Sequence, residues 1–174
     1  AEIKFGIDFT TESVQDMQEM VYSCSAITSL DLKSFNTVNV KYMQKMFSYC
    51  SNLQYLDVSS FNTESCENME QMFNYCKKLE YLDLSKFDVT YVTLMTDMFS
   101  TCSSLKSITF RTFNSNSAIN MQNMFYSCES LTSLDISTFD TSRVTTMEKM
   151  FYNCNSLTKL DLKLKLYVNI GEHS

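Results

Sequence analysis

The chain has no proline, only two glycines and a single histidine, and these absences argue against several kinds of site. Loops that cradle phosphate or a dinucleotide use several glycines to bring backbone N–H groups close to the ligand. The one histidine, His173, is next to last in the chain, and no nucleophile elbow or metalloprotease motif is present. We therefore predict that the protein is not an enzyme and has no cofactor and no bound metal.

Basic residues are also scarce. The chain has 14 Lys and Arg against 20 Asp and Glu, which gives a net charge of −6 and a pI near 4.8. Nucleic-acid surfaces need clustered Lys and Arg, so we expect no nucleic-acid partner. No apolar run reaches the 18 or more residues of a membrane span. The chain begins with Ala1 and not Met, so we expect a processed chain or an excised fragment, from which a signal or anchor could have been lost.

The dominant feature that is present is self-similarity with a step of 26 residues. All twelve methionines fall into two columns with this step: Met17, Met43, Met69, Met95, Met121 and Met147; then Met20, Met46, Met72, Met98, Met124 and Met150. Six of the seven cysteines keep it too: Cys24, Cys50, Cys76, Cys102, Cys128 and Cys154. A phenylalanine column follows as well: Phe9, Phe35, Phe61, Phe87, Phe113 and Phe139. A fixed period of this length is typical of a solenoid, in which one small unit stacks on itself and each column becomes an internal ladder.

One repeat, residues 53–78, indicates the shape of the unit. Residues 55–59 alternate polar and apolar side chains, which predicts a half-buried strand, and strands of successive repeats should pair in parallel about 4.8 Å apart. A polar turn follows. The apolar residues at positions 69, 72, 73 and 76 then recur at i, i+3, i+4 and i+7, which predicts a short helix.

The two ends depart from the repeat. We predict an N-terminal cap or degenerate repeat over residues 1–26, five full repeats over 27–156, and a C-terminal cap strand and tail over 157–174. In the last segment Lys163 and Lys165 stand between alternating apolar residues, where lysines could blunt unwanted pairing of an edge strand.

The repeat pattern LDLSxF-N/D-T-S-x-V-x-x-M-x-x-M-F-x-x-C-x-x-L is clearest in residues 131–157. It resembles the 26-residue BspA-type leucine-rich repeat of bacterial surface proteins, a family that includes mollicute lipoproteins of unknown function. The resemblance implies an α/β solenoid: a right-handed superhelix with a parallel sheet on its concave side and short helices on its convex side. It also implies a cell-surface or secreted protein. Local departures are the segment 108–110, where Ile-Thr-Phe replaces Leu-Asp-Leu, and Cys66 and Ala118, which replace a Val.

The cysteine column could mark a metal site, a disulfide framework, a catalytic thiol or a buried ladder. No C-x2-C pair is present, and like-oriented cysteines one rung apart exceed the Cβ separation that a disulfide prefers. We therefore expect buried, inert thiols, and we place the methionines in the core beside them.

An aspartate column lies on the predicted strand face: Asp31, Asp57, Asp83, Asp135 and Asp161. Stacked carboxylates repel one another, so something must offset the repulsion. Calcium is one candidate; hydrogen bonds to nearby hydroxyls or backbone groups, or simple solvation, are the others.

Variable outward positions of the strands are the candidate ligand-binding surface: Tyr55, Asp57, Tyr81, Asp83, Thr109, Arg111 and Asp135. Exposed tyrosines beside charges are typical of interface hot spots, although a plain solvated face would look similar. The leading hypothesis is a non-enzymatic adhesion or interaction module that binds a protein or a glycan on the concave strand face. The alternatives are a structural spacer or assembly element that associates end to end, and an intracellular scaffold.

Overall fold

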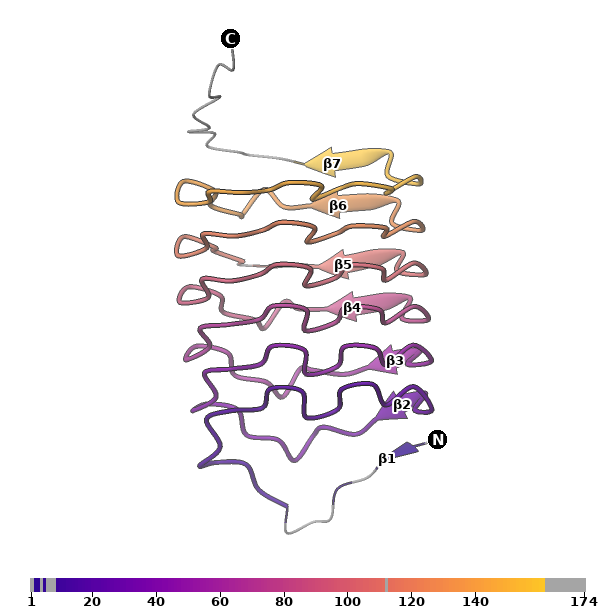
Figure 1. Ribbon diagram of the computed structural model, residues 1–174. Helices are drawn as coiled ribbons and strands as arrows, with labels where there is room; N and C mark the ends of the chain where they lie inside the picture. Colours follow the sequence, from indigo (N-terminus) through magenta and orange to yellow (C-terminus); the bar gives the residue numbers. More distant parts are fainter. Residues whose placement is uncertain (1, 4, 6–8, 112, 162–174) are drawn as a thin grey trace.

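The computed structural model of the protein describes residues 2–3, 5, 9–111 and 113–161. Successive coils of the chain lie one upon another, with the first and last described strands at opposite ends of the stack (Figure 1). The register between coils equals the sequence period, because Tyr81 pairs with Ser107 and Asp83 with Thr109, each 26 positions later.

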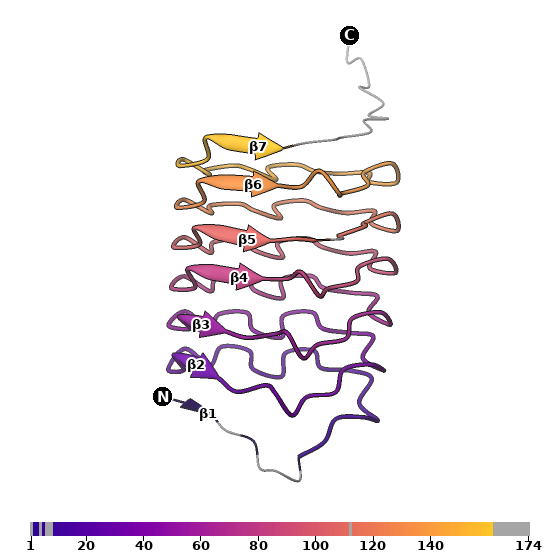
Figure 2. The ribbon, with the colours of Figure 1, turned by 180° about the vertical axis from the view of Figure 1, so that it is seen from behind.

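Short parallel strands follow one another up one side of the stack (Figures 1 and 2). They are β1 (Glu2–Ile3), β2 (Ser29–Leu30), β3 (Tyr55–Leu56), β4 (Tyr81–Asp83), β5 (Ser107–Thr109), β6 (Ser133–Asp135) and β7 (Lys159–Asp161). Parallel pairing joins β1, β2 and β3 in one sheet, β4 with β5 in a second, and β6 with β7 in a third. The predicted parallel strands are confirmed. In β4, β5 and β6 the central apolar residue is buried and its neighbours are exposed or half-buried, as in the exposed, buried, exposed pattern of β4.

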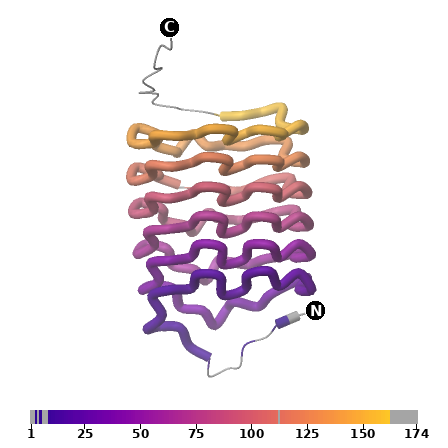
Figure 3. The backbone as a smooth tube through the Cα atoms, in the orientation of Figure 1, coloured from indigo at the N-terminus to yellow at the C-terminus, as the bar shows by residue number. Residues whose placement is uncertain are grey.

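The opposite side of the stack consists of turns, and we call its six parts the turn segments. They are residues 16–24, 42–50, 68–76, 94–102, 120–128 and 146–154. Isolated parallel bridges run through all six, from Asp16 to Tyr42 and onward to Thr146. The smooth trace shows these segments lying in register above one another (Figure 3).

The predicted helix over Met69–Cys76 is wrong, and no helix occurs in the described part of the chain. Two successive β-turns replace it, because the Met72 N–H donates to the Met69 carbonyl at 3.3 Å and the Cys76 N–H to the Phe73 carbonyl at 3.2 Å. Gln71 and Tyr75 hold the turns with φ of 54° and 60°. In two consecutive four-residue turns, positions 69, 72, 73 and 76 are the first and last residues of each turn, so they produce the spacing that indicated a helix.

Backbone hydrogen bonds between turn segments hold each coil to the next. Every second N–H donates to a carbonyl 25 residues later: Met43 to Asn68 (3.0 Å), Lys45 to Glu70 (2.8 Å), Phe47 to Met72 (2.9 Å) and Tyr49 to Asn74 (2.8 Å). The same four bonds recur between all six turn segments. The backbone polar groups of this side are therefore satisfied partly between coils and partly within the β-turns, and not within a helix.

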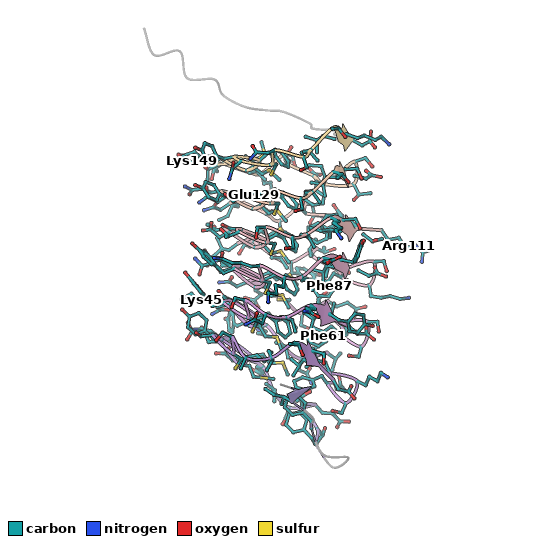
Figure 4. All side chains as sticks on the ribbon, turned by 90° about the vertical axis from the view of Figure 1, so that its right-hand side faces the viewer. Lys45, Phe61, Phe87, Arg111, Glu129 and Lys149 are labelled. Atoms are coloured by element: carbon teal, nitrogen blue, oxygen red, sulfur yellow. The ribbon has the colours of Figure 1, made fainter. Side chains whose placement is uncertain are left out.

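The core lies between the strands and the turn segments. Phe73 stacks on Phe47 and on Phe99 with ring centroids 5.6 Å apart in both pairs, at interplanar angles of 10° and 3°. Beside these rings, Met43, Met46, Met69 and Met72 have no exposed surface. Sulfur atoms and rings fill the interior in Figure 4, where Phe61 and Phe87 lie one above the other, with centroids 6.5 Å apart. This interior forms between coils, as expected when one repeat cannot bury its own apolar edge.

A column of hydroxyls adds buried polar bridges between coils. Thr63 Oγ1 donates to the Asp88 carbonyl at 2.7 Å and accepts from the Asp88 N–H at 2.8 Å. Thr37 bridges Asn62 in the same way, and Ser115 bridges Asp140. One hydroxyl thus satisfies both backbone groups of a residue in the next coil.

The prediction of a terminal strand is tested only as far as Asp161, where β7 ends. The expected continuation over residues 162–174, with Lys163 and Lys165, lies outside the described residues.

Candidate functional site

The outward side chains of the strands form an exposed surface, which we call the strand face. Tyr55 on β3 and Tyr81 on β4 are 65% and 60% exposed, while Leu56 and Leu82 beside them are buried. Alternation along each strand therefore carries both tyrosines outward. Lys106 Nζ lies over the Tyr81 ring, 5.6 Å from its centre.

A hollow of about 450 Å³ crosses β3, β4 and β5 on this face. Five of the seven residues predicted as ligand-binding line it: Tyr55, Asp57, Tyr81, Asp83 and Thr109. Its floor includes the buried side chains of Val58 and Leu82. The hollow spans the break between two sheets, since β3 and β4 are not paired.

A second hollow of about 270 Å³ adjoins the first, because Tyr55 and Asp57 line both. Asp31 and Lys33 form its other side. The combined surface therefore runs from β2 to β5, with acidic groups along it and one lysine at one end.

Arg111 and Asp135, also predicted as ligand-binding, do not line either hollow. Arg111 extends away from the stack beyond the end of β5 (Figure 4). Asp135 lies exposed on β6, two coils from Asp83. The structure thus brings five of the predicted residues together and leaves these two apart.

Backbone hydrogen bonds explain how the aspartate column is tolerated. The Oδ1 atom of four of the five aspartates accepts from the N–H two residues later: Asp31 from Lys33 (3.1 Å), Asp57 from Ser59 (2.9 Å), Asp83 from Ser85 (2.9 Å) and Asp135 from Ser137 (2.9 Å). The fifth, Asp161, pairs with Lys159 at 3.1 Å. The Ser59 hydroxyl and N–H lower the pKa of Asp57 by stabilising its charged form. Among the described residues no group of three or more His, Cys, Asp or Glu could hold a metal ion.

Lys106 and Glu80 flank the hollow and were missed in the sequence analysis. Lys106 Nζ lies 2.6 Å from Glu80 Oε2 and 5.6 Å from the centre of the Tyr81 ring. The hydrogen bond from Lys106 to Glu80 raises the pKa of Lys106. Both residues lie just before the strand positions whose alternation was considered. Their opposite charges, one 26-residue period apart, could have predicted the ion pair between neighbouring coils.

The cysteine column carries no disulfide and is buried in its four inner members, while Cys24 and Cys154 at its two ends are half-buried. All seven cysteines are free, and Cys50, Cys76, Cys102 and Cys128 have no exposed surface. Each of these thiols donates to a carbonyl of the preceding coil, as Cys76 does to Phe47 at 3.2 Å. Burial raises the pKa of Cys50 and of Cys66 to about 12, so these thiols stay protonated at neutral pH.

Residues 3–111 and 77–167 each match the family described as Mycoplasma protein of unknown function, DUF285. The two matches overlap at residues 77–111 and together span residues 3–167, as expected for a repeat unit that recurs along the chain. No curated protein and no solved structure matches the chain. In the described part, no helix has the length and apolar character needed to cross a bilayer. Because the family match spans almost the whole sequence, the chain belongs to the DUF285 family of Mycoplasma proteins of unknown function.

Proposed function

We propose that the protein is a non-enzymatic interaction module that binds a protein or glycan ligand in the strand-face hollow. In this proposal the stack is a right-handed solenoid of BspA-type leucine-rich repeats, with turn segments in place of the helices, and it is displayed on a cell surface or secreted. The observation that carries the proposal is the pair of exposed tyrosines, Tyr55 and Tyr81, on either side of a hollow of about 450 Å³.

The chemistry of the lining suits a ligand with both apolar and polar parts. A tyrosine offers a large apolar surface with few rotatable bonds and a hydroxyl at its tip, which favours binding at low entropic cost. The carboxylates of Asp57 and Asp83 each accept one backbone N–H at 2.9 Å, and because a carboxylate can accept several hydrogen bonds, both can also accept from a ligand. Hydroxyls of a sugar, or the N–H groups and cations of a peptide, would satisfy these acceptors.

The test is binding of the full chain to a printed array of glycans and to an array of extracellular proteins. We expect wild-type chain to bind at least one probe, and the double variant Tyr55→Ala, Tyr81→Ala to lose at least about tenfold in affinity, since tyrosine hot spots contribute 2 kcal/mol or more. The melting temperature should not change, because both rings are mostly exposed.

Tyr91→Ala is the matched control, because Tyr91 is also 65% exposed but lines a different hollow with Lys41 and Glu67. It should bind like wild type. Equal binding by wild type and the double variant would contradict the proposed site, as would absence of binding to every probe.

A further inference from the structure

One backbone bond that joins other neighbouring coils is absent at the break between β3 and β4. Just before β3, β5, β6 and β7, an N–H donates to a carbonyl of the preceding coil: Gln54 to Thr28 (2.9 Å), Lys106 to Glu80 (2.8 Å), Thr132 to Lys106 (3.5 Å) and Thr158 to Thr132 (3.0 Å). Just before β4, the corresponding bond from Glu80 to Gln54 is absent. Among the described residues, the Glu80 N–H and the Gln54 carbonyl have no other backbone partner. Backbone groups without a protein partner are satisfied by water or by a ligand.

These two open backbone groups belong to residues that line a third hollow, which we call the lysine hollow. It has a volume of about 390 Å³, and its lining is Gln54, Lys78, Glu80, Tyr81 and Ser104. Gln54 and Tyr81 also line the strand-face hollow, so the two hollows adjoin at the break between β3 and β4. A single elongated ligand can therefore occupy both.

The charged groups of the two hollows differ in sign. In the lysine hollow, the Glu80 carboxylate is already paired with Lys106 at 2.6 Å. Lys78 is exposed, and within the described part of the chain it forms no ion pair. One unpaired positive charge is therefore present in the lysine hollow, whereas the strand-face hollow carries the carboxylates of Asp57 and Asp83.

The lysine hollow also gathers hydrogen-bond donors that suit an anion. The Lys78 ammonium has three N–H donors and no acceptor, and the open Glu80 N–H and the Ser104 hydroxyl belong to the same lining. Hydrogen bonds to an ionised acceptor are about twice as strong as those between neutral groups. This combination favours a carboxylate or sulfate group over a neutral one.

The strand-face hollow requires a different chemistry from the rest of the ligand. Asp57 and Asp83 accept hydrogen bonds and repel an anion, so the part of the ligand beside them must be neutral and rich in donors. The negative faces of the Tyr55 and Tyr81 rings attract C–H groups. Sugar rings combine these properties, because they carry hydroxyl donors at their rims and C–H groups on their faces.

We propose that the ligand is an acidic oligosaccharide that crosses Tyr81, with neutral sugars in the strand-face hollow and a carboxylate or sulfate group bound by Lys78 and the Glu80 N–H in the lysine hollow. This inference rests on the proposed function, since it names the ligand class of the same site and adds the lysine hollow to it. An acidic peptide fits less well, because carboxylates spaced along it would meet those of Asp57 and Asp83.

The test is binding of the full chain to a printed array that holds each neutral oligosaccharide beside its sialylated and its sulfated form. The pair that binds best is then measured by calorimetry. We expect the acidic member to bind about tenfold more tightly than its neutral partner, which is the usual contribution of a hydrogen bond to a charged group. The sialylated and sulfated forms distinguish a carboxylate from a sulfate as the bound anion.

Lys78→Gln removes the unpaired charge and should reduce the affinity for the acidic member by about tenfold, to that of its neutral partner. The affinity for the neutral member should not change. Lys86→Gln is the matched control, because Lys86 is also an exposed lysine but lines neither hollow. This control should bind the acidic member like wild type.

The amide resonance of Glu80 reports on the anion directly. In ¹⁵N–¹H spectra of the full chain, the acidic member should shift the Glu80 resonance downfield, as a new hydrogen bond to an anion does, and the neutral member should not. The Thr158 amide is the internal control, because its bond to the Thr132 carbonyl, at 3.0 Å, is already made. Its resonance should stay in place with both.

The proposal is overturned by equal affinity for acidic and neutral members, by equal binding of wild type and Lys78→Gln, by an unchanged Glu80 resonance, or by binding to protein probes alone. Its failure is distinguishable from failure of the proposed function. If the double variant Tyr55→Ala, Tyr81→Ala loses binding while Lys78→Gln does not, the strand-face site stands and the anion site fails. If wild type binds no probe of any kind, both fail.

Discussion

Replacing Thr63 by valine should remove a bridge between two coils without changing the shape of the core. Thr63 is 1% exposed, and its hydroxyl makes both hydrogen bonds to the backbone of Asp88, at 2.7 and 2.8 Å. Valine has nearly the shape of threonine but cannot make either bond. The fold already accepts valine at this place, because Val89, one period later, occupies the same column and is fully buried.

The expected loss follows from the two bonds. A hydrogen bond contributes about 1 kcal/mol net, and a buried backbone group left without a partner costs about 1–3 kcal/mol. We expect Thr63→Val to lower the free energy of unfolding by about 2–3 kcal/mol. For a chain of this size that corresponds to a decrease in Tm of about 4–12 °C.

The reciprocal variant Val89→Thr provides the matched comparison. Its hydroxyl would lie opposite the backbone of Asn114, whose N–H and carbonyl have no partner among the described residues, and it should raise stability by about 1 kcal/mol. Urea unfolding followed by circular dichroism measures both changes, provided that the slope with denaturant is unchanged. A loss below about 0.5 kcal/mol in Thr63→Val, or a loss of stability in Val89→Thr, would refute the role of the hydroxyl column.

Two further predictions concern the turns and the thiols. Thr101→Gly should stabilise the protein by about 0.5–1 kcal/mol, because Thr101 is β-branched and held at φ 61°, where glycine has no steric penalty. The control variant Thr96→Gly, in the neighbouring turn and without a positive φ, should destabilise the protein. A change of Tm in the same direction for both variants would contradict this reasoning. The free energy of unfolding should also fall as pH rises from about 9 toward 12. Burial raises the pKa of Cys50 and Cys66 from 9.0 to about 12 in the folded protein. Between these values the thiols of the unfolded chain lose protons that the folded protein keeps, and this favours the unfolded state. Denaturation midpoints measured across this range would show the decrease, and replacement of both residues by alanine should reduce it; an unchanged slope with pH in that double variant would contradict the assignment.

The sequence predicted the parallel register because the 26-residue period of the repeat is also the offset between residues that pair on neighbouring strands. Asp83 faces Thr109 for this reason, and the inward and outward alternation around Leu82 follows from strand geometry alone. The outward tyrosines could be placed for the same reason. These features depend only on the order of side chains along one repeat.

The turn segments could not be predicted in the same way, because two structures share one pattern. Met69, Met72, Phe73 and Cys76 have the spacing of a helix face and also that of the first and last residues of two consecutive β-turns. The distinguishing property is a positive φ at Gln71 and Tyr75, and neither residue type signals it. Glycine would have signalled it, but the chain has only two glycines, and the hydrogen bonds to the next coil stabilise the conformation instead.

The extent of the candidate site also depends on information that one repeat does not contain. The alternation of side chains is the same in β3 and β4 as in other neighbouring strands, so it does not indicate that these two strands are unpaired. The break between two sheets falls between them, and the hollow crosses this break. Arg111 was grouped with the site by its alternation, although it extends away from the stack (Figure 4).

The central claim is that the backbone of the turn segments bonds between coils and not within a helix. Scalar coupling through hydrogen bonds, measured by NMR between an amide nitrogen and a carbonyl carbon, tests it most directly. The Phe73 nitrogen should couple to the carbonyl carbon of Met98, to which its N–H donates at 2.9 Å. Coupling of Phe73 to the carbonyl carbon of Met69, four residues earlier, is the signature of an α-helix and would contradict the account.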